Sequence, residues 1–207
     1  MCFRMALYLP FVQFPATSHK ENPESGFLVT ANERTVEKDD NRQISGVWYS
    51  PERSERIADL LSKRNDWSAE DTKKMQLDVY SRMAEKTLLT FKSAEGELNT
   101  AIAKLPEKKQ KRAKAALQLF AKFDNTMTKD SQGGALIAAF YHVFTRNVFG
   151  DELEIDSPLW KNFIDTNLRS YNAPQDHILG REESPFFDDI KTQQKETKAD
   201  MFALSLA

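Results

Sequence analysis

The chain has 207 residues, of which 40% are apolar and 29% charged, with 29 Lys and Arg against 31 Asp and Glu. An apolar fraction that includes 14 Phe is sufficient for a buried core and excludes a globally disordered chain. The formal net charge of −2 gives no long-range attraction to nucleic acid, and the single cysteine, Cys2, excludes an intrachain disulfide and a cysteine-based zinc site.

The first 15 residues (MCFRMALYLPFVQFP) are apolar but do not form a convincing signal peptide. Their positively charged start is weak, and Pro10 interrupts the apolar run early. No run in the chain approaches the roughly 20 apolar residues that cross a bilayer, so we expect no membrane span.

Residues 1–50 are predicted to be an extended segment with one or two short strands. Residues 22–26 (NPESG) indicate a turn, and residues 27–31 (FLVTA) are a compact β-prone run. Residues 44–49 are expected to form either a second strand or an extended approach to a helix.

From residue 51 onward the sequence predicts mostly helices. Ser50 is expected to be an N-cap with Pro51 at the first helical position, and the apolar pattern runs to about residue 64. Residues 68–71 (SAED) resemble a capping box, and apolar residues at i+4 spacing predict a helix that continues to about residue 91.

The second half contains the most apolar helix of the chain. Pro106 is expected to begin a helix that includes Phe123, and residues 124–130 are expected to form a loop. Residues 135–148 are apolar nearly all round, which predicts an interior helix with His142 as a core residue. Residues 199–207 form an amphipathic run without a terminal cap, as expected for an internal piece of a longer protein.

Three motifs occur in a fixed order. The first is the turn and β-prone run of residues 22–32 (NPESGFLVTAN), the second is residues 48–61 (WYSPERSERIADLL), and the third, expected inside a helix, is residues 76–81 (QLDVYS). This ordered set resembles the β-subunit of penicillin acylases and their relatives, a family of N-terminal nucleophile hydrolases. Residues 123–125 (FDN) and 130–131 (DS) are similar to the family's aromatic-Asp-Gly turn and Asp-Ser helix start, and the resemblance covers roughly residues 9–149.

The resemblance implies a fold class and a domain organisation. The parent enzyme would be a four-layered αββα sandwich, and this chain would be a mainly α fragment of it with one or two N-terminal strands. Residues 1–207 would then be a single partial domain, with 1–50 as an extended or strand segment of the sandwich and 51–207 as a mostly helical excursion.

The resemblance also implies site residues. In the family, an N-terminal serine attacks an amide carbonyl while its own α-amino group, which titrates near neutrality, accepts the proton. Asn32 matches the family asparagine whose side-chain amide donates to the oxyanion, and Arg53 matches an arginine with an orienting or structural role near the pocket. The implied function is hydrolysis of a linear amide or N-acyl bond by acyl transfer.

The chain departs from the family pattern in several places. We expect it to lack the nucleophilic serine and the second oxyanion donor, so that it is inactive without the rest of the precursor, its expected partner. A calcium site recurs in the family, and Asp39 and Asp40 lie near one expected ligand position without clear register. Family members work outside the cytoplasm, so a periplasmic or secreted parent is expected.

Other interpretations of the same residues remain open. The chain is alternatively a small helical binding or scaffold protein without enzymatic activity, and Cys2 is alternatively an N-terminal nucleophile. Asn32 is alternatively a turn residue, and Arg53 and Arg56 a solvated helix face with the neighbouring Glu52 and Glu55. Asp78 and Ser81 are expected to have structural roles.

Overall fold

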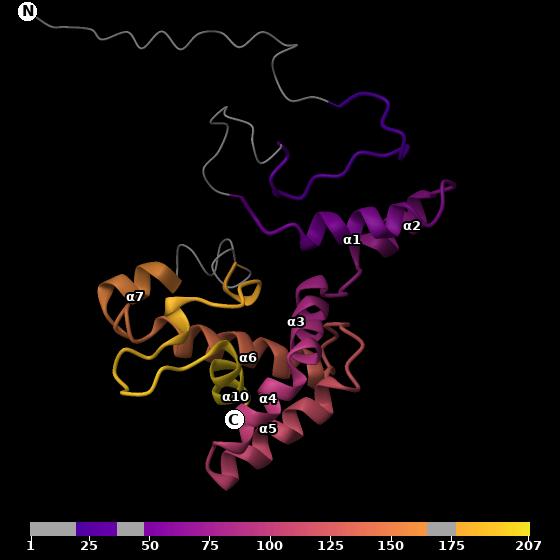
Figure 1. Ribbon diagram of the computed structural model, residues 1–207. Coiled ribbons are helices and arrows are strands. Elements are labelled where there is room, and N and C mark those ends of the chain that lie inside the picture. The colour runs from indigo at the N-terminus through magenta and orange to yellow at the C-terminus, as the bar shows by residue number, and fades with distance from the viewer. Residues whose placement is uncertain (1–19, 37–47, 165–176) are drawn as a thin grey trace, which may run out of the picture.

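The computed structural model describes residues 20–36, 48–164 and 177–207. Within these ranges the chain is mainly helical and contains no β strand, so the prediction of a mainly α chain is confirmed. Figure 1 shows α1 (Glu52–Leu61) and α2 (Ala69–Gln76) at one end of the molecule, with the extended residues 20–36 beyond them. We call these helices, together with residues 20–36 and 48–50, the α1 layer.

The predicted strand at residues 27–31 is wrong for this structure. These residues have no regular secondary structure, although their side chains alternate between more covered and more exposed positions as in a strand. A strand is stabilised by ladder hydrogen bonds to a neighbour, and no described residue pairs with this backbone. The second predicted strand, residues 44–49, lies mostly outside the described residues, and Trp48 and Tyr49 are irregular.

Helix α1 begins differently from the prediction. Its N-cap residue is Pro51, which has helical dihedral angles and provides no side-chain cap, so the assignment of Ser50 as N-cap is wrong. The Ser50 hydroxyl instead donates to the carboxylate of Glu52. The helix ends at Leu61, close to the predicted end.

The single helix predicted from residue 68 to about 91 is divided into two. The capping box at the start of α2 is present, since Ser68 accepts from the Asp71 N–H and the Asp71 carboxylate accepts from the Ser68 N–H. Helix α3 (Arg82–Ser93) then begins at a second cap, where Ser81 accepts from the Ala84 N–H.

The break between α2 and α3 has a tertiary cause. Residues 79–81 pair with residues 125–127 through an isolated antiparallel bridge between Tyr80 and Thr126. The Ser81 N–H donates to the Asn125 carbonyl over 2.8 Å, and the Met127 N–H donates to the Val79 carbonyl over 2.9 Å. These partners take the backbone out of the helical path, so the third motif lies between helices and not inside one.

The remaining helices include several that the sequence predicts, but the helix at Glu95–Ala103 was not predicted, and Phe123 lies beyond the end of the helix that follows Pro106. They are α4 (Glu95–Ala103), α5 (Glu107–Phe120), α6 (Gln132–Phe149), α7 (Pro158–Asn162), the 3₁₀ helix η3 (Pro185–Phe187) and α10 (Lys198–Leu206). Helix α6 is an interior helix as predicted, but His142 is exposed and the prediction of a core histidine is wrong. An interior helix can still have one solvent-facing side, and that side carries His142.

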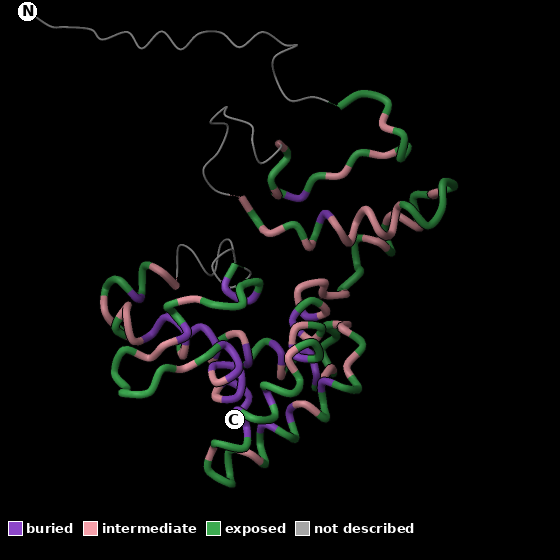
Figure 2. Tube along the Cα trace, in the orientation of Figure 1, coloured by how far each residue is buried: buried purple, intermediate pink, exposed green. Residues whose placement is uncertain are grey.

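Helix α10 is the centre of the hydrophobic core. It packs against α4, α5 and α6, and nearly all of its residues are buried. Phe202 lies 5.0 Å from the ring centroid of Phe91 on α3 and 5.4 Å from that of Phe144 on α6. We call α3 to α6 together with α10 the helical core. In Figure 2 the buried residues gather here, whereas the α1 layer is mostly intermediate or exposed.

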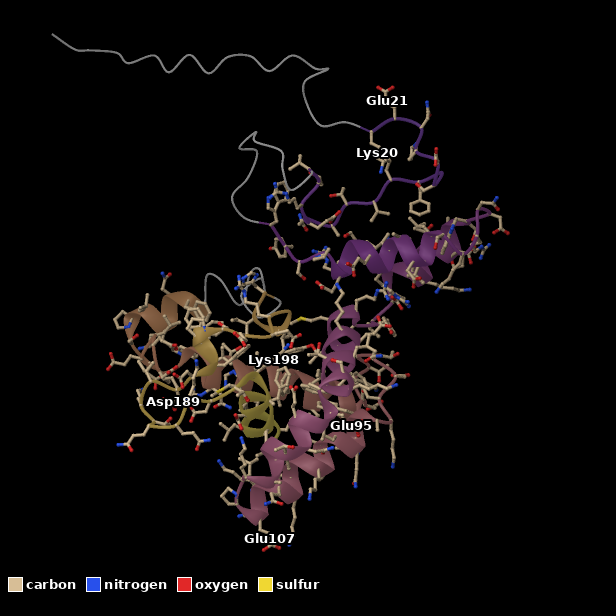
Figure 3. All side chains as sticks on the ribbon, viewed as in Figure 1. Lys20, Glu21, Glu95, Glu107, Asp189 and Lys198 are labelled. Carbon is tan, nitrogen blue, oxygen red and sulfur yellow. The ribbon has the colours of Figure 1, made fainter. Side chains whose placement is uncertain are left out.

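The two ends of the molecule also differ in how charged residues are placed. Figure 3 labels Lys198 at the start of α10 within the helical core, and Lys20 and Glu21 on the extended segment beyond α1. Lys198 is buried with its ammonium 5.7 Å from the centroid of the Phe202 ring, and burial lowers its pKa. Lys20 and Glu21 are exposed.

Candidate functional site

Asn32 and Arg53, which the sequence suggested separately, are in direct contact. The Arg53 Nη1 donates to the Asn32 side-chain oxygen over 3.1 Å and to the Ala31 carbonyl over 3.3 Å. Arg53 lies in the first turn of α1, so the helix start positions the guanidinium beside the end of the β-prone run. Both side chains are exposed.

The contact determines which way the Asn32 amide faces. A guanidinium has donors and no acceptor, so the side-chain atom that meets Arg53 is the oxygen Oδ1. The amide nitrogen Nδ2 therefore faces away from Arg53, and no described residue accepts from it. The site presents a neutral double N–H donor whose orientation is set by a cation.

The Asn32 backbone is also restrained. Its φ angle is 72°, in the left-handed region that asparagine tolerates better than most residues. Its carbonyl accepts from the Tyr49 N–H over 3.0 Å, and the neighbouring Ala31 N–H donates to the Glu33 carboxylate over 2.6 Å. Asn32 thus lies in a bend and not at a strand tip as predicted, but its position relative to α1 is well defined.

The second and third sequence motifs meet through an ion pair that sequence reasoning missed. Arg56 donates to both carboxylate oxygens of Asp78, over 2.6 and 3.0 Å, and to Asp59 over 3.2 Å. Its guanidinium lies 4.3 Å from the centroid of the Tyr80 ring. The hydrogen bond from Arg56 lowers the pKa of Asp78, and the same bond raises the pKa of Arg56.

These contacts correct the interpretation of α1 as a solvated charged face. Glu52 and Glu55 both pair with Lys86 on α3, over 2.7 and 2.9 Å. Arg56 and the two glutamates therefore connect α1 to later parts of the chain. No local pattern in the sequence signals these contacts, because the partners lie 22 or more positions apart.

A groove lies between α1, α2 and the start of α3. Its volume is about 700 Å³, and we call it the α1 groove. Arg53 and Arg56 line it together with a set of apolar side chains, which are Tyr49, Ile57, Leu60, Met75, Val79, Met83 and Met127. The groove therefore begins at the residue that orients Asn32.

The turn that follows α5 explains one departure from the family pattern. Asn125 stands where the aromatic-Asp-Gly pattern has glycine, and its φ angle of 64° is in the region that favours glycine or asparagine. Asp124 accepts from the Thr126 N–H over 2.9 Å, as in an Asx turn. Ser131 then caps α6 by accepting from the Gly134 N–H over 3.0 Å, which confirms the helix start.

An acidic pair after α6 was not anticipated. Burial, then a hydrogen bond with Asp151, raises the pKa of Glu152 to about 7. The Asp151 Oδ2 accepts from the Ile190 N–H over 2.8 Å, while Asp151 Oδ1 and Glu152 Oε2 are buried without a donor. Two adjacent acceptors of this kind are satisfied when one proton is shared between them.

The described residues contain no group of three or more His, Cys, Asp or Glu side chains arranged to hold a metal ion. Asp39 and Asp40, the residues named for a calcium ligand, lie outside the described residues, as does Cys2. Calcium binding and a nucleophilic cysteine remain predictions. No helix in the described ranges is long and apolar enough to cross a membrane.

Comparisons with known proteins agree with the resemblance. The penicillin amidase family matches residues 5–207. The acyl-homoserine lactone acylase QuiP of Pseudomonas aeruginosa is 41% identical over 190 residues, which are 90% of this chain and 22% of that protein. Proteins of the same name from Pseudomonas syringae pv. tomato and Pseudomonas putida are 37% and 34% identical, over 91% of this chain in each case.

The matched relatives are much longer than this chain. It spans 22%, 23% and 24% of the three proteins named above. No solved structure matches the chain significantly.

Proposed function

Because the chain belongs to the penicillin amidase family, we propose that it is part of an amidohydrolase that cleaves a linear amide or N-acyl bond by acyl transfer. Its relatives are named as acylases, which supports this reaction class. The nucleophile is assigned to the large part of the acylase body that this chain does not span.

The observation that supports a catalytic contribution is the orientation of the Asn32 amide. Acyl transfer passes through a tetrahedral intermediate whose oxygen carries a negative charge, and donors placed in advance stabilise that charge. Arg53 engages the Asn32 oxygen over 3.1 Å and leaves Nδ2 as the outward donor. We therefore assign Asn32 as an oxyanion donor and Arg53 as the residue that orients it.

The pairing also explains why Arg53 suits this position. A guanidinium is charged at every working pH and has a fixed planar set of donors, so it meets the Asn32 oxygen and the Ala31 carbonyl from one direction. A lysine ammonium is a point charge with rotating donors and would hold the amide less strictly. Arg53 acts through Asn32 and is a positioning residue.

The first substrate class to test is the N-acyl homoserine lactones. The relatives from Pseudomonas aeruginosa and Pseudomonas syringae are named for this substrate. The bond to be cleaved is the amide between the acyl chain and the homoserine lactone nitrogen. A periplasmic or secreted parent enzyme is part of the same proposal.

The test uses a chimera. Residues of this chain replace the matching 190-residue segment of the Pseudomonas aeruginosa acylase, and hydrolysis of an N-acyl homoserine lactone is measured. Asn32→Ala should lower kcat by about 100- to 1000-fold with little change in thermal stability, as the loss of one oxyanion donor does. Asn32→Asp, which offers no donor when ionised, should be similarly inactive.

Arg53 variants separate orientation from direct chemistry. Arg53→Ala should lower kcat less than Asn32→Ala does, and Arg53→Ala combined with Asn32→Ala should be no worse than Asn32→Ala alone, because the arginine acts through the amide. A folded chimera in which Asn32→Ala retains full turnover would overturn the assignment of Asn32.

A further inference from the structure

Helix α1 is amphipathic but buries none of its apolar side chains. The only buried residue of α1 is Ser54, and α2 has no buried residue. Ile57, Leu60 and Leu61 are only partly covered. A helix in a finished globular fold normally buries such a stripe against a neighbour.

The uncovered stripe belongs to the α1 groove. Val79 is 46% exposed and Met127 is 37% exposed, and both line the groove with Ile57 and Leu60. Leu77, directly before the third motif's Asp78, is 78% exposed. Single exposed apolar residues are common on surfaces, but an apolar groove with an adjacent exposed leucine marks an interaction surface.

We propose that the α1 groove docks the part of the acylase body that lies outside this chain. This inference rests on the proposed function, because it takes the chain as part of a larger amidohydrolase. The occupant is one partner, the polypeptide that carries the nucleophile, and its contact with the groove is apolar.

The length of the relatives favours this occupant. The chain spans 22% of the Pseudomonas aeruginosa acylase, so the rest of such a protein has to contact this segment somewhere on its surface. The helical core also has an apolar groove, of about 480 Å³ between α3, α4 and α5, but that groove does not reach the Asn32–Arg53 pair, whereas the α1 groove does.

Continuity with the Asn32–Arg53 pair is the second argument. Arg53 lines the α1 groove and also holds the Asn32 amide. An oxyanion donor functions only when a nucleophile lies beside it, so the polypeptide that supplies the nucleophile has to approach this end of the groove. The same polypeptide would then reach the apolar side chains that follow along α1.

The backbone beside the site adds a third argument. The described residues provide no ladder partner for residues 27–30, which are extended with alternating exposure, and Leu28 is 62% exposed. Extended backbone of this kind pairs readily with another strand. Both the groove and the extended segment therefore present surface for a partner next to the Asn32–Arg53 pair.

The experiment places charges in the groove of the chimera described above. Val79→Asp and Met127→Asp, made together, would bury unpaired carboxylates in an apolar contact and should lower soluble yield by about tenfold or more. The control is Leu159→Asp on α7, since Leu159 is 57% exposed and lies outside both the α1 groove and the apolar groove between α3, α4 and α5. This control should leave yield and turnover unchanged.

The same variants, made in the isolated chain, test whether the occupant of the α1 groove lies outside this chain. Both should have only a small effect on its melting temperature, since Val79 and Met127 are 46% and 37% exposed in the isolated chain. A clear destabilisation by Val79→Asp with Met127→Asp would show that the chain itself fills the groove and would overturn the proposal. A dimer of the isolated chain that these substitutions dissociate would show a second copy as the occupant, with the same consequence.

Failure of this inference differs from failure of the proposed function. A chimera with Val79→Asp and Met127→Asp that folds and turns over substrate normally overturns the docking surface and leaves the role of Asn32 intact. A folded chimera in which Asn32→Ala is fully active overturns the function and leaves the docking surface intact.

Discussion

The helical core and the α1 layer differ in composition and are stabilised by different interactions. In the helical core, Phe91, Phe140, Phe144 and Phe202 lie in mutual contact and α10 fills the centre. In the α1 layer, the main connections are the ion pairs of Arg56 with Asp78 and of Lys86 with Glu52 and Glu55. The core buries most of its aromatic side chains, whereas the layer carries the candidate site and buries little apolar surface.

This difference indicates that the helical core provides structural support and that the α1 layer carries the candidate site. Burial of aromatic side chains gives a closely packed support. Ion pairs and single hydrogen bonds fix the direction of α1 without closing its apolar side. The residues assigned to function, Asn32 and Arg53, lie in the part of the molecule that is least buried.

The largest expected effect comes from the helical core. Phe140→Ala removes a fully buried ring and should lower the free energy of unfolding by about 3–5 kcal/mol. Ile57→Ala, the matched change in the α1 layer, should cost less than about 1 kcal/mol because the side chain is only partly covered. Urea unfolding of both variants measures the contrast, and equal losses would show that the layer is packed as tightly as the core.

The next effect concerns the ion pair that holds α1. A double-mutant cycle with Arg56→Ala and Asp78→Ala should give a coupling free energy of about 1 kcal/mol, above an exposed pair because both side chains are partly buried. Hydrogen exchange of the α1 amides should become faster in each single variant, while the amides of α10 are unaffected. A cycle with no coupling would remove this pair as the connection between the two motifs.

A smaller effect is expected at the turn after α5. Asn125→Ala puts an alanine, which has no polar side chain to stabilise a left-handed backbone, at a φ angle of 64°. The substitution should lower the free energy of unfolding by about 1 kcal/mol. Asn125→Gly restores the residue of the family pattern and should change stability by less than about 0.5 kcal/mol. Thermal unfolding distinguishes the two, and equal destabilisation would assign the effect to the lost amide and not to the backbone.

The smallest effect depends on pH. The pKa of Glu152 rises from 4.5 to about 7 on folding, first because of burial and then because of its hydrogen bond with Asp151. The folded state therefore binds the proton more tightly, and this group's contribution to the free energy of unfolding is present at low pH and is lost as pH rises through 7. The pKa of Asp151 is lowered, so its contribution to the free energy of unfolding is lost as pH falls and not as pH rises, in a more acidic range than that of Glu152.

Glu152→Gln tests the pH effect, because glutamine keeps the shape and has no titration. The variant should lack the fall in urea stability between pH 5 and 8 that the unaltered chain shows. Since Glu152 is only partly buried, solvent screening keeps the change small. An unchanged slope in the variant would assign the pH dependence to other groups.

Several local features could be predicted because they depend on neighbours in sequence. The capping box of Ser68 and Asp71 requires only residues three apart, and it is present. The helix start at Ser131 and the turn at residues 124–126 follow the same logic. The interior character of α6 was also predictable, because few surface helices are apolar on nearly every side.

The errors occurred where a distant partner decided the outcome. The division between α2 and α3 depends on pairing of residues 79–81 with residues 125–127, which no local pattern reports. The strand predicted at residues 27–31 has the right composition but no neighbouring strand among the described residues. Ser50 has cap chemistry, but its hydroxyl bonds to Glu52 and the helix begins at Pro51.

The sequence by itself determined the family, the mainly helical class and the identity of the candidate residues, since motif order and hydrophobic periodicity are properties of the chain alone. Only the tertiary structure placed the Arg53 guanidinium against the Asn32 oxygen and joined Arg56 to Asp78. The physical reason is that side-chain orientation depends on contacts between residues about 20 positions apart, and such contacts form only when helices and turns bring those residues together.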